Sequence, residues 1–151
     1  MKKIITGIIL TCVSIFAQSF TVKNFPPNEI LGLYWSPKKD AKIEIYLKGG
    51  QFFGKFVWAA TLRKDAKNPN KSLQNSDILG LEFLTKFVYD DGVYNGGEIY
   101  DPETGKTYSC KMNLDGSKLK VRGYMGISLF GRTEYFERVK QIFRTCLIKK
   151  L

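Results

Sequence analysis

Short runs of alternating polar and apolar residues, separated by tight turns, constrain the fold of this chain more than any other feature. The clearest run covers residues 106–114, where Tyr108, Cys110, Met112 and Leu114 alternate with polar side chains. Successive side chains of a β-strand point to opposite faces, so this pattern predicts a strand with one buried face. The chain is therefore expected to build its core from sheet faces.

Turn sequences recur along most of the chain. Gly49-Gly50, Asp91-Gly92 and Asp115-Gly116 are typical of hairpins, and residues 101–105 place Pro and Gly where a β-turn favours them. The strands predicted between the turns cover residues 29–35, 42–48, 51–60, 83–89, 93–100, 106–114, 118–122 and 133–139. The segment 51–60 is apolar at successive positions and is expected to be covered on both faces.

About eight short strands with tight turns predict an all-β fold. The two architectures that fit are a small antiparallel barrel and a sandwich. A barrel of about eight strands is just wide enough to hold one small ligand. The long connection at residues 61–76 is the exception to the short turns, and its length is typical of a functional or mobile loop.

The first nineteen residues have the features of a secretory signal peptide. A short basic start, Met1-Lys2-Lys3, precedes the apolar run 4–17, and Ala17 and Ser19 are small residues suited to cleavage before Phe20. The run is shorter than the ~20 residues that a membrane-spanning helix needs, which disfavours an anchor. We therefore expect residues 1–19 to be removed, the barrel domain to cover residues 20–139, and the protein to be periplasmic or secreted.

The C-terminal residues 140–151 form an amphipathic basic tail. Their apolar residues have helical spacing, so the tail is expected to be a short helix that packs on the barrel wall or lies on an anionic membrane surface. The tail contains Cys146. The strand pattern turns Cys110 inward, so a disulfide between the two requires the tail to cover the barrel mouth. The sequence is compatible either with a Cys110–Cys146 disulfide or with two free thiols.

The residue types present argue against catalysis and against a metal centre. The chain has no histidine, the commonest general base and metal ligand. Its closely spaced acidic residues sit in turns, where Asp is favoured for backbone reasons. The segment "KDAKNPN" (64–70) lacks the spacing of a calcium loop and is interpreted as an Asx-rich turn. No enzyme activity, metal or cofactor is predicted.

The charge and the aromatic content bear on the partner. A net charge of +10 fits an anionic partner, although it also serves solubility, and export disfavours nucleic acid. The 21 aromatic residues (11 Phe, 8 Tyr and 2 Trp) could line an apolar cavity with a polar mouth, the usual form of a small-ligand site. Strand alternation selects as candidate lining residues Phe56, Trp58, Tyr108, Met112 and Val121. The candidates for polar contacts to a ligand are Tyr100, Arg122 and Tyr124.

Five blocks of sequence resemble a known family. They are "LGLYW" (31–35), "GKFVWA" (54–59), "DAKNPN" (65–70), "GGEIYDPETGKTYSCKM" (96–112) and "LKVRGYMGISLFGRTEYFERV" (119–139). In this order they resemble the exported bacterial family known as domain of unknown function 2147, which is similar to lipocalins. The resemblance implies a small antiparallel barrel able to hold an apolar molecule, and it brings no established activity.

Lipocalins carry a Gly-x-Trp motif in the first strand and a basic residue that stacks on the Trp. Here Gly32 and Trp35 are one residue further apart than in that motif. The resemblance implies that Arg138 or Arg132 lies over Trp35, with a cation–π contact worth roughly 0.5–2 kcal/mol. Trp35 is therefore included among the candidate ligand-binding residues.

Two hypotheses about function follow. In the first, the protein is an exported, non-enzymatic binding protein that holds a fatty-acid-like apolar or amphipathic ligand. In the second, it is an envelope or secreted interaction protein with a filled core that acts through its basic surface. An open cavity of a few hundred Å³ or more would favour the first. The ligand and the oligomeric state are not determined by the sequence.

Overall fold

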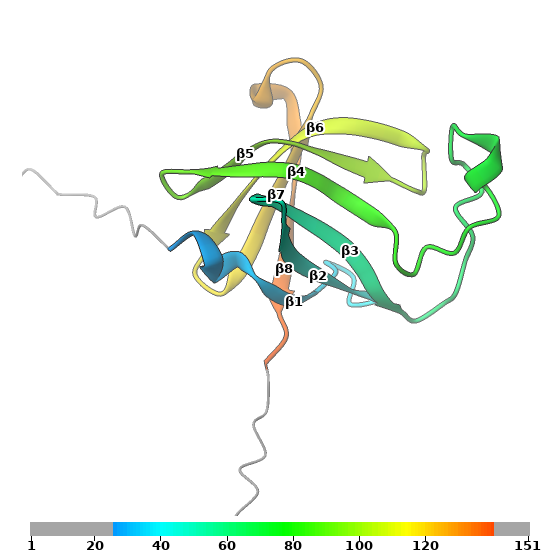
Figure 1. Ribbon diagram of the computed structural model, residues 1–151, viewed down its shortest axis with the longest axis horizontal. Coiled ribbons are helices and arrows are strands. Elements are labelled where there is room, and N and C mark those ends of the chain that lie inside the picture. The colour runs from blue at the N-terminus through cyan, green and yellow to red at the C-terminus, as the bar shows by residue number, and fades with distance from the viewer. Residues whose placement is uncertain (1–25, 141–151) are drawn as a thin grey trace, which may run out of the picture.

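The computed structural model describes residues 26–140, and these form a closed antiparallel barrel of eight strands (Figure 1). Each strand pairs with its neighbour in sequence, and β1 pairs with β8 to close the barrel. The strands are β1 (Gly32–Trp35), β2 (Ala41–Lys48), β3 (Gln51–Ala59), β4 (Glu82–Asp90), β5 (Val93–Asp101), β6 (Lys106–Asp115), β7 (Lys118–Tyr124) and β8 (Gly131–Arg138). Three short 3-10 helices accompany them, η1 (Pro27–Ile30), η2 (Lys71–Leu73) and η3 (Ser128–Phe130).

The predicted antiparallel barrel is thus confirmed. The predicted signal peptide, Cys146 and all of the predicted helical tail except Lys140 lie outside the described residues. Within residues 26–140, no helix is long and apolar enough to cross a membrane.

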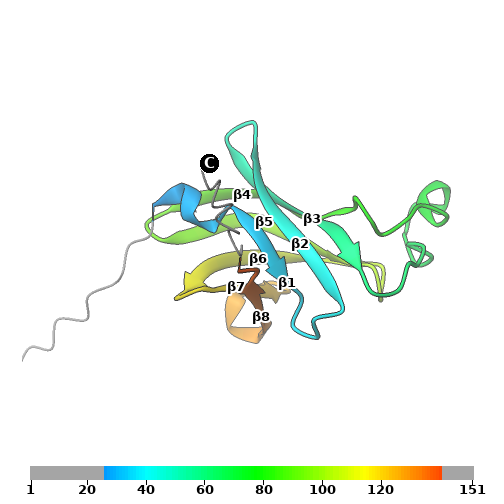
Figure 2. The same cartoon turned by 90° about the horizontal axis from the view of Figure 1, so that it is seen from below.

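The two ends of the barrel have different connections. At one end, two-residue turns join β2 to β3, β4 to β5 and β6 to β7. Gly49 and Gly50 both have positive φ, as the tightest hairpin turns require. At the other end lie four longer connections, at residues 36–40, 60–81, 102–105 and 125–130. We call the first end the closed end and the second the open end. Figures 1 and 2 place η1 and the 60–81 loop on opposite sides of the barrel.

Helix η1 belongs to the closed end, where buried tyrosines fix it. The Tyr34 hydroxyl donates a hydrogen bond to the Ile30 carbonyl at 2.8 Å, and the Tyr94 hydroxyl donates to the Pro27 carbonyl at 2.6 Å. The Ile30 side chain is fully buried. Burial raises the pKa of Tyr34 to about 12, although the Arg138 guanidinium opposes the shift. Helix η1 therefore plugs this end of the barrel.

Arg138 completes the closed end, but not over the residue that the resemblance implied. Its guanidinium carbon lies 4.8 Å from the centre of the Tyr34 ring, and its nitrogens donate to the Tyr34 hydroxyl at 2.5 Å and to the Leu31 carbonyl at 2.9 Å. A further hydrogen bond reaches the Glu29 carbonyl. The prediction that an arginine covers Trp35 is wrong, because Tyr34 points inward and the next residue of the strand points outward.

The tightly packed core fills the closed half of the barrel. Its side chains are almost completely buried and come from η1 and all eight strands, namely Ile30, Tyr34, Ile45, Phe52, Leu84, Phe87, Tyr94, Cys110, Met112, Leu119 and Phe136 among others. Small residues make room for the largest rings. A Cβ atom on Gly97 would lie 2.4 Å from the Phe87 ring. No buried side-chain N or O atom in the described part of the chain lacks a hydrogen-bond partner.

Candidate functional site

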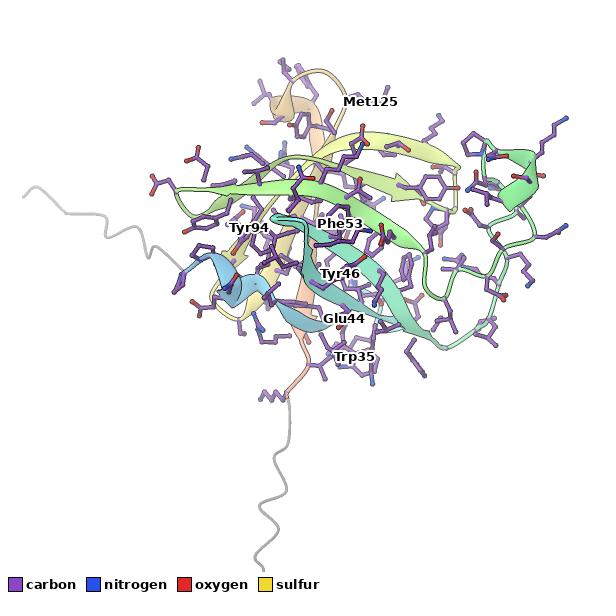
Figure 3. The ribbon with its side chains drawn as sticks, in the orientation of Figure 1. Trp35, Glu44, Tyr46, Phe53, Tyr94 and Met125 are labelled. Carbon is purple, nitrogen blue, oxygen red and sulfur yellow. The ribbon has the colours of Figure 1, made fainter. Side chains whose placement is uncertain are left out.

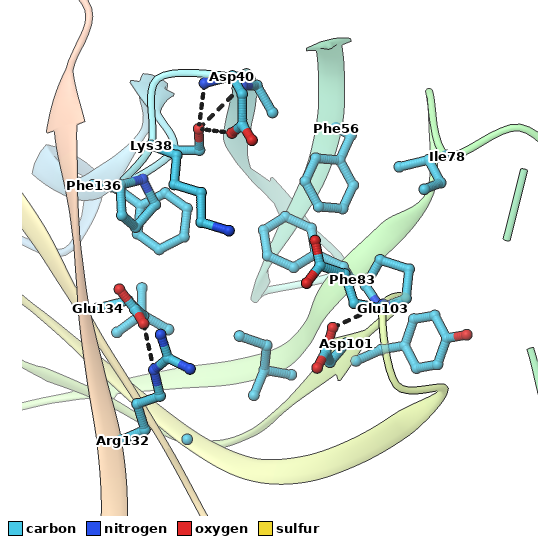
Figure 4. Close-up of a pocket in the computed structure, with 18 of the residues that line it drawn as sticks. Lys38, Asp40, Phe56, Ile78, Phe83, Asp101, Glu103, Arg132, Glu134 and Phe136 are labelled. Carbon is cyan, nitrogen blue, oxygen red and sulfur yellow. Dashed lines mark hydrogen bonds and ion pairs between the residues drawn. The ribbon is translucent and has the colours of Figure 1, made fainter. Parts of the chain in front are cut away.

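A cavity of about 1010 Å³ occupies the open half of the barrel (Figure 4). Most of its lining comes from strand ends and from the four connections of the open end. The apolar part of the lining consists mainly of Phe56, Ile78, Phe83, Ile99, Val121 and Phe136. Phe56 and Phe83 stack with ring centres 4.2 Å apart. The barrel is therefore packed at one end and hollow at the other.

Charged side chains surround the mouth of the cavity, and most are already paired. Arg63 forms an ion pair with Glu103 at 3.2 Å, and Arg132 forms one with Glu134 at 2.6 Å. Both pairs lie among the lining residues and are partly exposed to solvent. Exposed ion pairs of this kind contribute little to stability, about 0–1 kcal/mol. Arg63 and Arg132 therefore each already have an acidic partner within the protein.

Lys38 differs from the other cations of the mouth. Its side chain extends toward the cavity from the 36–40 connection (Figure 4). It forms no ion pair or hydrogen bond with any residue that the structure describes. The nearby Asp40 carboxylate accepts a hydrogen bond from the Ser36 hydroxyl at 2.8 Å, and Asp101 accepts two within its own turn. Lys38 therefore supplies a positive charge at the mouth that is not paired with any residue between 26 and 140.

A buried carboxylate fastens the 60–81 loop to the rim. Asp65 is 1% exposed. It accepts hydrogen bonds from the Tyr100 hydroxyl at 2.7 Å and from the Asn68 amide at 2.6 Å. Partial burial, followed by the hydrogen bond to Asp65, raises the pKa of Tyr100 to about 12. The loop is thus tied to the end of β5.

The segment 64–70 is the Asx-rich turn expected from the sequence. The Asn70 backbone N–H donates to the Asn68 side chain at 2.9 Å. Gly105 lies so close to this turn that a Cβ atom there would be 2.0 Å from the Lys67 carbonyl oxygen. Within residues 26–140, no three potential metal-ligating side chains cluster together.

The 125–130 loop between β7 and β8 forms another part of the rim. The Arg122 guanidinium donates to the carbonyls of Ser128 at 2.8 Å and Leu129 at 3.0 Å, and to the Thr133 hydroxyl at 2.8 Å. These bonds hold the loop on the outer face of the barrel. They also occupy Arg122, which the sequence suggested as a polar contact for a ligand.

The structure brings five of the nine predicted site residues together around the cavity. The five are Phe56, Tyr100, Tyr108, Val121 and Tyr124. The four that do not line it are Trp35, Trp58, Met112 and Arg122. Met112 points inward but is fully buried in the closed-half core, because its position in β6 lies deeper than the cavity. Cys110 is fully buried as well, and its burial raises the pKa of the thiol to about 12.

The two tryptophans lie on the outside of the barrel, where their rings meet edge to face at 5.6 Å. The Lys42 amino group lies 4.4 Å from the centre of the Trp35 ring. An irregularity in the β2–β3 pairing explains the position of Trp58. Ile43 pairs with Phe56 but Lys42 pairs with Trp58, so Val57 is an extra residue.

Such a bulge reverses the alternation of faces beyond it. Val57 and Trp58 are accordingly 38% and 42% exposed, and the prediction that residues 51–60 are covered on both faces is wrong at these positions. Figure 3 shows Trp35 far from Met125, which belongs to the mouth.

Several lining residues were not predicted. Phe83, Ile99 and Phe136 lie in predicted strands, and alternation alone could have identified them. Nothing in the sequence distinguishes Lys38 from the other exposed lysines, because its position depends on how the 36–40 connection folds over the mouth. The same holds for Phe130, which lies in a loop.

Comparisons with known proteins agree with this geometry. A family model described as "Uncharacterized protein conserved in bacteria (DUF2147)" matches residues 32–138. The chain is also similar to a solved structure, protein HP1028 from the human pathogen Helicobacter pylori, which is described as belonging to the lipocalin family. The TM-score is 0.68 at 23% sequence identity, over 75% of this chain and 84% of that chain. No curated protein matches significantly. The likeness to HP1028 concerns the fold, and it confirms the predicted lipocalin-like barrel.

Proposed function

This chain belongs to the bacterial family DUF2147, and from its lipocalin-like barrel we infer that it is an exported, non-enzymatic protein that binds one small amphipathic molecule. The lipocalin-like fold suggests small-ligand binding in general, and the details of the site support a more specific proposal. The apolar part of the ligand occupies the cavity, and an anionic group lies at the mouth.

The cavity is the observation that carries this proposal. At about 1010 Å³ it is as large as the pockets that hold drug-sized ligands. The buried lining side chains, such as Val121 and Phe83, are apolar, whereas the paired charged lining side chains are partly exposed to solvent. The alternative hypothesis required a filled core, and a hollow half-barrel favours the first hypothesis over it.

The position of Lys38 at the mouth supports an acidic head group. Since Arg63 and Arg132 are paired with protein carboxylates, the side chain of Lys38 remains to meet an incoming anion. A fatty-acid-like carboxylate would gain an exposed ion pair there while its hydrocarbon part is removed from water. Apolar burial contributes about 25 cal/mol per Å², so the chain of the ligand supplies most of the affinity and Lys38 supplies orientation.

The signal-peptide-like sequence at residues 1–19 supports export, to the periplasm or out of the cell. The arrangement of the mouth supports binding without chemistry. The acidic side chains there are engaged in ion pairs or turns. The larger part of the cavity lining is apolar, which suits retention of an apolar molecule.

The proposal is tested first by what the purified protein carries. Native mass spectrometry, followed by organic extraction, is expected to reveal a bound small amphiphile. A delipidated sample is then expected to bind a long-chain fatty acid with a stoichiometry of one. A sample with no bound molecule and no affinity for such acids would contradict the proposal.

A spectroscopic reporter must be placed inside the cavity, because Trp58 lies on the outer face and does not report on it. Ile99→Trp puts an indole in the lining, whereas Val88→Trp puts one on an exposed site of β4. Ligand addition is expected to change the emission of the Ile99→Trp protein and to leave that of the Val88→Trp protein unchanged. Equal responses would place binding outside the barrel.

The role of Lys38 has a matched control in the next residue. Lys39 is paired with Glu137 at 2.9 Å and does not line the cavity. Lys38→Met is expected to weaken binding of a fatty acid about three- to fivefold, the range of an exposed ion pair. Its effect on the corresponding alcohol should be absent, and Lys39→Met should change neither affinity.

A further inference from the structure

The 125–130 loop is the most apolar exposed segment of the described chain. Met125, Ile127, Leu129 and Phe130 are 73%, 60%, 74% and 77% exposed. Four large apolar side chains within six residues form a patch of the kind that marks an interaction site. We propose that this loop docks the open end of the barrel onto an anionic lipid surface, with these four side chains inserted among the lipids.

The loop is held in the exposed position. The Arg122 guanidinium donates hydrogen bonds to the carbonyls of Ser128 and Leu129, so the backbone of η3 is anchored to β7. The apolar side chains that flank these carbonyls do not fold back onto the barrel wall. A loop fixed in this way loses little conformational entropy when it inserts, which favours binding.

The charge around the loop fits an anionic surface. From Gly116 to Thr133 the sequence contains four cations and no acidic residue. Arg122 and Arg132 lie beside the loop, and the side chain of Arg132 is 87% exposed, whereas Lys118 and Lys120 lie further along β7 toward the closed end. Basic residues close to an anionic membrane contribute about 1 kcal/mol each, an attraction that salt screens. The apolar tip and the basic flanks are the two components of interfacial binding.

The loop is continuous with the cavity. Met125 and Phe130 are both exposed at the tip and part of the cavity lining. Their side chains therefore connect the outer apolar patch with the interior. A lipid surface is the partner for which this continuity matters, because an apolar molecule could pass from it to the cavity without crossing water. This role in loading rests on the ligand binding proposed above, whereas docking itself rests on the loop alone.

A second copy of the chain or another protein fits the loop less well. A stable protein interface buries about 800 Å² on each partner. The exposed apolar tip is only six residues long, and its neighbours on β7 are basic, which would repel the same face of a second copy. A lipid surface needs no complementary shape and accepts a narrow protruding tip.

The test uses the full chain and a reporter on the loop itself, since the N-terminal or C-terminal segments could also hold the chain to a membrane. Leu129→Trp places an indole at the tip, and Val88→Trp places one on an exposed site of β4. Both are mixed with phosphatidylcholine vesicles containing about a quarter phosphatidylglycerol, with bromine atoms on the lipid chains as quenchers. Insertion of interfacial segments reaches about 5–10 Å, which brings the tip within quenching range.

Quenching of the Leu129→Trp protein is expected to be at least about twice that of the Val88→Trp protein, and to fall at high salt or with phosphatidylcholine alone. Equal quenching of the two proteins would overturn the proposal. So would a Leu129→Trp signal that changes with protein concentration in the absence of vesicles, because this would identify the loop as an interface between copies.

A second pair of variants separates docking from ligand binding. Ile127→Ser/Leu129→Ser removes two apolar side chains that do not line the cavity, and Leu47→Ser/Val88→Ser removes two exposed ones elsewhere. Only the loop variant is expected to lose vesicle-stimulated transfer of a fluorescent fatty acid, by about tenfold. Its affinity for the free fatty acid in solution should not change. If no variant binds fatty acid but the tip is still quenched, docking stands and the proposed ligand function fails.

Discussion

The closed and open halves of this barrel are built from the same strands but use their side chains in opposite ways. In the closed half, buried rings fill the space between the strands, and the backbone carbonyls of η1 are satisfied by Tyr34, Tyr94 and Arg138. In the open half, strand ends and loops surround a cavity of about 1010 Å³. The difference separates what holds the fold together from what is available for a ligand.

The contrast extends to the two groups of polar contacts. Arg138 at the closed end forms no ion pair within the described part of the chain, and its guanidinium donates hydrogen bonds to backbone carbonyls and to the Tyr34 hydroxyl. Arg132 at the open end forms an ion pair with Glu134, and its own side chain is 87% exposed. Buried hydrogen-bond partners are costly to lose, whereas exposed ion pairs are nearly neutral. The free energy of unfolding should therefore depend strongly on the closed half and weakly on the mouth.

The largest expected difference concerns one phenylalanine from each half. Phe87 is fully buried, so Phe87→Ala removes a ring from a packed core and should lower the free energy of unfolding by about 4 kcal/mol. Phe130 is 77% exposed, and Phe130→Ala should change it by less than about 0.5 kcal/mol. Urea unfolding of both variants measures the two values. Comparable losses would show that the mouth is part of the cooperative core.

The next comparison uses the two arginines. Arg138→Met leaves the Leu31 carbonyl and the Tyr34 hydroxyl without their donor, and should cost about 3 kcal/mol. Arg132→Met should cost less than about 0.5 kcal/mol, because only an exposed ion pair is lost. Urea unfolding at two salt concentrations is the measurement. A stability loss for Arg138→Met that disappears at high salt would contradict a role through buried hydrogen bonds.

The fold was largely predictable because the sequence signals that specify it act over a few neighbouring residues. Alternation and turn residues are short-range signals, and they placed strands such as β5 and β6 within one residue of their observed bounds. The closed half follows directly from them. Alternation failed at Trp58, because the bulge at Val57 depends on pairing with β2 and leaves no signal in the sequence of β3 alone.

The candidate site was only partly predictable, since its mouth is assembled from segments that are distant in sequence. Tyr100 and Asp65 are 35 residues apart, and their hydrogen bond exists only when the 60–81 loop folds onto β5. The same applies to Lys38. Arg138 or Arg132 was expected to stack on Trp35 because the tryptophan matched the lipocalin residue type. Arg138 lies over Tyr34 instead, because the Tyr34 side chain points inward. Side-chain direction decided the contact more than residue type did.

A smaller effect is expected where the 60–81 loop meets the β5–β6 turn. Gly105 has a φ of 72°, and a Cβ atom there would collide with the Lys67 carbonyl. Gly116 at the closed end has a φ of 60° and open space around it. Gly116→Ala should cost about 1 kcal/mol of backbone strain, and Gly105→Ala about 2 kcal/mol, because it also displaces the loop.

Hydrogen exchange distinguishes the two glycine variants better than global stability does. Gly105→Ala should increase exchange in the 60–81 loop and leave β6 and β7 protected, because loop opening is a local event. Gly116→Ala should leave the loop unchanged. Faster exchange throughout the barrel in Gly105→Ala would mean that the open end is not separable from the core.

The smallest effect concerns the Tyr100 hydroxyl at the open end. Tyr100→Phe removes one of the two side-chain donors of the buried Asp65 carboxylate and should cost about 1 kcal/mol at neutral pH.

The native Tyr100 has a pKa raised to about 12, above its value of 10.0 in the unfolded chain. The folded state therefore keeps this proton at a pH where the unfolded state has lost it. Stability from this group is complete below pH 10 and is lost as the pH rises toward 12. Since Tyr34 keeps its raised pKa in the variant, Tyr100→Phe should make this alkaline decline shallower without abolishing it. Urea unfolding at several pH values between 9 and 12 gives the slope, and an unchanged slope would mean that Tyr100 is not held by Asp65 in solution.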